Sequence, residues 1–172
     1  MLDLAHPANA AVLYYLQAQH PNAAPSQSPA AVDLWNLGTH LDLVDCLWRE
    51  ASAALPTVTV IVPPAGERAE PLAFKRCACA WVVYGLAALV HEESGLLFAF
   101  VDGTSTLAVR LPSDDLARAF DMEGPRYGRA YQYPDSSVEA AQFGADWVLV
   151  EPYSRRVEDW LVTAYLHVEM LV

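Results

Sequence analysis

The segment spanning residues 79–111 constrains the fold most, because long apolar runs alternate there with short turn signals. We predict three strands in it, with the sequences CAWVVYGLAALVH, LLFAFV and TLAVRL, and we interpret Gly85 as a bulge or bend within the first. HEESG separates the first two strands. Asp102-Gly103 predicts a hairpin turn between the last two, because both residues tolerate the positive φ of a primed turn. Strands in such close succession predict an antiparallel sheet.

Helical periodicity flanks these strands on both sides. After Gly38, apolar residues recur at helical spacing from Leu41 to Leu55, with Thr39 as the expected N-cap. Ser113 predicts the start of another helix that ends before Gly124-Pro125, and residues 154–171 predict the last one. GRAYQY and DWVLVE predict two further strands, whereas TVTVIV (residues 57–62) fits either an edge strand or an insertion.

The predicted fold class is therefore α+β, in the order α-β3-α-β2-α, with a mainly antiparallel sheet of about five strands and helices on one face. Residues 1–30 contain a short helical pattern followed by a run rich in Pro, Ala and Ser. We expect them to form a mobile N-terminal helical arm and linker in front of a single domain at residues 31–172.

Composition narrows the range of partners. The formal net charge of the 172-residue chain is −11, from 10 basic against 21 acidic residues, which argues against nucleic acid and anionic membranes. No apolar run near the middle reaches the roughly 20 residues of a membrane helix, and the N-terminus lacks the basic start of a signal peptide, so we expect a cytoplasmic protein. Cys46, Cys77 and Cys79 are too few for a structural zinc site, and we expect no metal and no cofactor.

His91, Glu92 and Glu93 form the most reactive-looking cluster, since a carboxylate can orient a histidine as a base. We identify neither an evident nucleophile nor an oxyanion donor near them in the sequence. The chain also lacks the G-x-S-x-G, G-x-G-x-x-G and G-x-x-x-x-G-K motifs. We therefore predict no catalytic residue, and we favour a solvated turn for this cluster.

Two other segments are candidate ligand sites. Trp35, Asn36 and His40 surround a helix start in a mixture suited to a small pocket, although Trp35 could equally be a hydrophobic anchor. Arg155 and Arg156 open the last helix, where backbone N–H groups already favour anions, so they could complete a carboxylate or phosphate site. The alternative is that both arginines point to solvent or pair with the excess acid.

The succession LLFAFVDG, TLAVRLP, a helix, and DWVLVE leading into a terminal helix with Trp160 and Tyr165 resembles the YjbR-like proteins. The element order is also similar to that of the TfoX N-terminal domain and the type III secretion chaperones. The resemblance covers roughly residues 41–171 and implies a fold. It carries over no catalytic signature, because YjbR-like proteins have no settled activity. The TfoX domain is linked to regulation of DNA uptake competence, a role that the acidic charge argues against here.

From these features we expect a non-enzymatic binding or protein-interaction module. The alternative is a small-molecule-binding protein or an enzyme of unrecognised type, with a pocket near Trp35, His40, His91 and Arg155. We also expect a homodimer, because a hydrophobic fraction of 54% and a mean hydropathy of +0.18 predict more apolar surface than one core absorbs. The N-terminal segment could cross to the neighbouring subunit, or it could fold back on its own domain.

Overall fold

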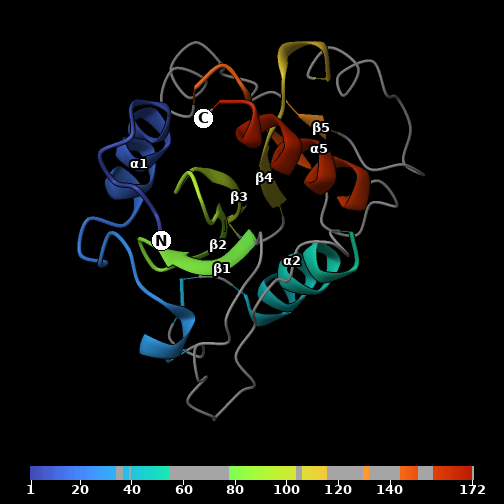
Figure 1. Cartoon of the computed structure of the whole chain (residues 1–172). Coiled ribbons are helices and arrows are strands. Elements are labelled where there is room, and N and C mark those ends of the chain that lie inside the picture. The colour runs from blue at the N-terminus through green and yellow to red at the C-terminus, as the bar shows by residue number, and fades with distance from the viewer. Residues whose placement is uncertain are drawn as a thin grey trace.

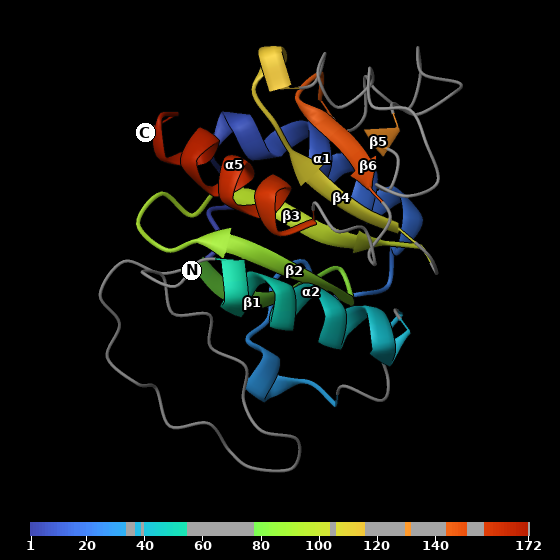
Figure 2. The ribbon, with the colours of Figure 1, turned by 90° about the vertical axis from the view of Figure 1, so that its right-hand side faces the viewer.

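The sheet is built almost entirely from the segment that the sequence marks most clearly. The computed structural model describes residues 1–33, 37–38, 40–54, 78–103, 106–115, 130–131, 144–150 and 157–171. The strands in these ranges are β1 (Ala78–Val83), β2 (Leu86–His91), β3 (Leu97–Asp102), β4 (Thr106–Arg110), β5 (Ala130–Tyr131) and β6 (Trp147–Val150). They form one sheet in the order β1-β2-β3-β4-β6-β5, with every neighbouring pair antiparallel (Figure 1 and, with all six strands labelled, Figure 2).

The α+β class and the antiparallel sheet are thus confirmed, and one predicted strand becomes two. We expected residues 79–91 to form one strand with a bend at Gly85, but Tyr84 and Gly85 form a two-residue turn between Val83 and Leu86. Both turn residues have positive φ, at 47° and 79°. A tyrosine rarely adopts this backbone conformation, so Tyr84-Gly85 is not recognisable as a two-residue turn, although Gly85 indicated a bend. Tyr84 is buried in the core, which fixes the turn through packing.

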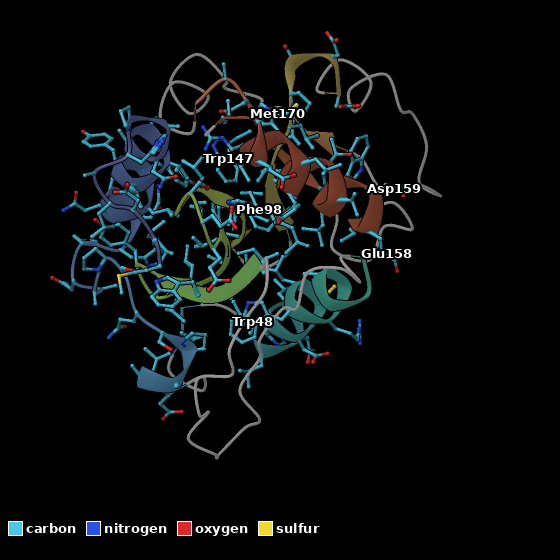
Figure 3. The ribbon with its side chains drawn as sticks, in the orientation of Figure 1. Trp48, Phe98, Trp147, Glu158, Asp159 and Met170 are labelled. Carbon is cyan, nitrogen blue, oxygen red and sulfur yellow. The ribbon has the colours of Figure 1, made fainter. Side chains whose placement is uncertain are left out.

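Helices α2 (Leu41–Ala54) and α5 (Val157–Glu169) cover one face of the sheet. Both confirm the predicted apolar periodicity, and they contact each other as well as the strands. The core on this face includes Leu47 and Trp48 from α2, Leu161 from α5, and Phe98 from β3. Figure 3 shows Trp48 and Phe98 between these elements.

Helix α1 (Pro7–Gln19) lies on the opposite face of the sheet (Figure 1). The prediction of helices on one face therefore holds for α2 and α5 only. Asn9, Val12, Leu13 and Leu16 recur at helical spacing and are all buried against this face. The predicted mobile arm instead packs as part of the domain, since a sheet with apolar residues on both faces needs a cover on each.

The segment after α1 also lies against the sheet. It contains the short 3₁₀ helix η1 (Pro29–Ala31), and Gln27 pairs with Val82 of β1, its N–H donating to the Val82 carbonyl at 2.8 Å. Residues 113–115 begin the predicted helix after β4, and its remainder lies outside the described residues, as does the TVTVIV segment. None of the helices within the described ranges is long and apolar enough to cross a membrane.

Candidate functional site

Of the predicted pocket residues, the structure describes His40 and His91, and it does not bring these two together. Trp35, Asn36, Arg155 and Arg156 lie outside the described residues. His40 is exposed at the start of α2, where its Nδ1 accepts a hydrogen bond from the Asp42 N–H at 3.3 Å. The chain next to it is held at the β1–β2 turn, because the Gly38 N–H donates to the Gly85 carbonyl at 3.1 Å. His91 lies at the other end of β2. Because a strand rises about 3.3 Å per residue, His91 is about 17 Å from that turn.

His91 is buried, with only 3% of its surface exposed, so the prediction of a solvated turn is wrong for this residue. Its Nδ1 accepts a hydrogen bond from the Ser94 N–H at 3.3 Å and lies 2.9 Å from Ser94 Oγ. Its ring contacts Tyr165 of α5, with 4.9 Å between the ring centroids. Burial lowers the pKa of His91, and the nearby Glu169, Glu93 and Glu92 oppose that shift only in part. His91 is therefore a neutral residue that closes the turn beneath α5.

The other two residues of that cluster fit the prediction better. Glu93 is exposed and Glu92 is half-buried in the turn between β2 and β3, which spans residues 92–96. The turn is closed by a hydrogen bond from the Gly95 N–H to the His91 carbonyl at 2.9 Å, with Gly95 at a φ of 67°. Two carboxylates thus remain available at the surface beside the buried imidazole.

Asn9 of α1 joins the N-terminal segment to this same turn, a role that no motif in the sequence indicates. It is fully buried. Its Nδ2 donates to the carbonyl oxygens of Asp3, at 2.8 Å, and Gly95, at 2.9 Å. Its Oδ1 accepts from the Leu97 N–H at 3.0 Å, beside a register shift in the β2–β3 pairing. Because these bonds satisfy the side-chain amide, Asn9 has a structural role.

A second polar cluster surrounds Arg110, at the end of β4. This side chain is buried, and its Nε donates to the carboxylate of Asp146, which directly precedes β6. Its Nη2 donates to the Ala8 carbonyl of α1 at 2.9 Å, and the guanidinium lies 5.8 Å from the ring centroid of Trp147. Among the described residues, none is a hydrogen-bond partner of its Nη1. Arg110 therefore joins β4 to the start of β6 through an ion pair and joins the sheet to α1 through a hydrogen bond.

His167 of α5 completes this cluster. Its Nε2 lies 3.7 Å from Asp146 Oδ2, which is too far for a hydrogen bond. Burial lowers the pKa of His167, and the Arg110 charge lowers it further, whereas Asp146 and Asp115 act in the opposite direction. His167 is thus neutral near pH 7. In the part of the chain that the structure describes, His167 Nε2 and Arg110 Nη1 are both buried and have no hydrogen-bond partner.

The sequence contained one signal for the Arg110 cluster. Arg110 is the charged residue of the apolar strand TLAVRL, and a charge on a buried strand requires a partner. Asp146 stands 36 positions further along, and the antiparallel register that pairs Arg110 with Trp147 brings it alongside. Local periodicity carries no information on that register.

The described residues contain no group of three or more His, Cys, Asp or Glu side chains that could hold a metal ion. Cys46 is buried in α2, whereas Cys77 lies outside the described ranges. In comparisons with known proteins, no family model, no curated protein and no solved structure matches this chain.

Large apolar side chains at the surface of the described residues concentrate at the two chain ends. They are Met1 (78% exposed), Leu4 (48%), Tyr14 (66%), Leu166 (49%), Met170 (74%) and Leu171 (40%). All except Tyr14 lie in the first four residues or in the last turns of α5 and the residues that follow it.

These two terminal segments lie at the same end of the molecule. The Asp3 N–H donates to the Gly95 carbonyl at 2.9 Å, and Tyr165 of α5 contacts His91 at the base of the same turn. Figure 2 shows the N-terminus, the β2–β3 turn and the C-terminal end of α5 on one side of the molecule. We call this surface the terminal face. It consists of Met1, Leu4, Glu92, Glu93, Leu166, Glu169, Met170 and Leu171.

The terminal face is acidic as well as apolar. Glu93 and Glu169 are exposed on it, and Glu92 is half-buried. Among the described residues, the Lys and Arg side chains are Arg49, which lies on α2 and pairs with Asp45 at 3.4 Å, and the buried Arg110. Neither belongs to the terminal face.

Proposed function

We propose that the protein is a non-enzymatic interaction module that binds a partner protein through the terminal face. The observation that carries this proposal is the concentration of exposed apolar side chains at one end of the domain. Single exposed apolar residues are common on protein surfaces, but a group of them contributed by two segments is typical of an interaction site.

The positions of the ionisable groups support the same proposal. Catalysis requires a base or nucleophile that a substrate can reach, in contact with a group that orients it. His91 and Arg110 are buried, and His167 is half-buried beside Asp146 with its Nε2 atom buried. The alternative small-molecule pocket would need His40 and His91 together, and they lie at opposite ends of β2.

Two predictions from the sequence stay predictions: that the protein is cytoplasmic, and that its fold is similar to that of the YjbR-like proteins. A second copy of the chain is the competing partner. It would cover the apolar side chains, but it would also bring Glu93 and Glu169 close to the same residues of the other subunit, at a formal charge of −11 each. That repulsion favours a different protein as the partner.

The proposal is tested with the double variant Leu166→Ser/Met170→Ser in an affinity purification from the native cell extract. We expect wild-type protein to recover one partner in stoichiometric amount and the double variant to lose it. Tyr14→Ser is the matched control, because Tyr14 is an exposed apolar residue of α1 outside the terminal face. A partner retained by the double variant, or none recovered with wild type, would contradict the proposal. A thermal shift with a metabolite, lost in His40→Ala, would favour the alternative.

A further inference from the structure

We infer that the segment docking on the terminal face is a basic amphipathic helix of another protein, an inference that rests on the proposed function. The terminal face combines an apolar strip on a helix with carboxylates beside it. A partner segment that satisfies both must present apolar residues and Lys or Arg side by side.

The apolar strip has the shape of a helix ridge. Leu166 lies on α5 and Met170 directly follows the helix, where its N–H donates to the Leu166 carbonyl at 3.3 Å, so the two side chains lie one above the other on the same side. Leu161, Ala164 and Val168 point the other way, into the core. A row of residues at i and i+4 packs into the groove between the rows of a second helix. The flexible side chain of Met170 adapts to different apolar partners.

The carboxylates set the charge of the partner. Glu169 lies on α5 between Leu166 and Met170, and Glu92 and Glu93 lie on the adjacent β2–β3 turn. Figure 3 shows Met170 at one end of α5 and Glu158, also exposed, near the other end. Lys or Arg residues flanking the apolar side of the docked helix would face these carboxylates. Exposed charge pairs add little affinity each, and their main effect is on the association rate and on the choice of partner.

The inference is tested with two fluorescein-labelled helical peptides of identical length and Leu positions. One carries Lys at every polar position, and the other carries Glu. We expect the Lys peptide to bind the wild-type protein in fluorescence anisotropy, and the Glu peptide not to bind. Raising the salt concentration from about 50 mM to about 500 mM should weaken binding several-fold, because exposed charges are screened.

Variants show whether the peptide occupies the terminal face. Leu166→Ser/Met170→Ser should weaken binding of the Lys peptide about tenfold or more, as expected for loss of a central apolar contact. Glu93→Lys/Glu169→Lys should reverse the preference, so that this variant binds the Glu peptide more tightly than the Lys peptide. Tyr14→Ser should bind like wild type, and circular dichroism verifies that each variant is folded.

Equal binding of the Lys peptide by wild type and Leu166→Ser/Met170→Ser would overturn the inference, because a peptide attracted only by net charge does not depend on those side chains. No binding to wild type would also overturn it. If the purification still recovers a partner that depends on Leu166 and Met170, the proposed function stands and only the basic helix is wrong. A wild-type dimer in sedimentation that Leu166→Ser/Met170→Ser converts to a monomer would identify a second copy as the occupant, and would refute the basic helix.

Discussion

Replacing Asn9 with alanine should test how the N-terminal segment is held to the sheet. The substitution removes three hydrogen bonds: a part-buried one donated to the Asp3 carbonyl, a buried one donated to the Gly95 carbonyl, and a buried one accepted from the Leu97 N–H. The Gly95 carbonyl keeps the bond that it accepts from the Asp3 N–H. The Leu97 N–H loses its acceptor in a buried position.

The size of the effect follows from these contacts. A buried hydrogen bond contributes about 0.5–1.5 kcal/mol net, and an unsatisfied buried donor costs about 1–3 kcal/mol. We therefore expect the free energy of unfolding to fall by about 3 kcal/mol, a large part of the 5–15 kcal/mol typical of a domain. For a chain of this size, that loss corresponds to a melting temperature lower by about 6–12 °C.

The assay is thermal and urea unfolding followed by circular dichroism, with Tyr14→Ala as the matched control. Tyr14 lies on the same helix and is 66% exposed, so both variants gain the same helix propensity of alanine while only one loses buried contacts. Tyr14→Ala should change stability by less than about 0.5 kcal/mol. Equal unfolding midpoints for the two variants would refute the reasoning that Asn9 joins α1 to the β2–β3 turn.

Three further predictions concern the turns and the buried charges. Gly95→Ala should lower the free energy of unfolding, measured in urea, more than Gly103→Ala does. Both glycines have positive φ. A Cβ at Gly95 would lie 2.7 Å from the Asp3 nitrogen, whereas a Cβ at Gly103 would meet nothing within 4 Å. Equal losses would contradict this. Arg110→Met should cost about 3 kcal/mol, because it leaves the Asp146 carboxylate without its cation; an unchanged urea midpoint would show that the ion pair contributes nothing. Folding lowers the pKa values of His91 and His167. As the pH falls below 6.5, the unfolded chain therefore binds protons before the folded chain does, and the free energy of unfolding should decrease. His91→Gln/His167→Gln should reduce that pH dependence, and an unchanged slope would contradict it.

Local sequence signals were sufficient for most of the elements. LLFAFV and TLAVRL form β3 and β4, and the Asp102-Gly103 turn between them has Gly103 at a φ of 63°. The periodicity that predicted helices around Leu47 and Leu161 also identified the sides of α2 and α5 that are buried. These signals are readable because residues within a few positions of each other determine the helical or extended conformation.

The errors arose where packing overrides local preference. Tyr84 adopts a positive φ that its side chain disfavours locally, and its burial in the core compensates. His91 stands beside two glutamates in the sequence, yet it is buried because α5, more than 60 positions later in the chain, covers it with Tyr165. Neither outcome could be inferred from neighbouring residues.

The amino-acid sequence by itself determined the α+β class, the antiparallel strands, the acidic character of the chain and the inward sides of two helices. Only the tertiary structure decided that α1 covers the second face of the sheet, that Arg110 meets Asp146, and that the two chain ends share one surface. The physical reason is that secondary structure follows from interactions between near neighbours. A site follows from strand register and helix docking, which bring together side chains such as Asn9 and Leu97, 88 positions apart.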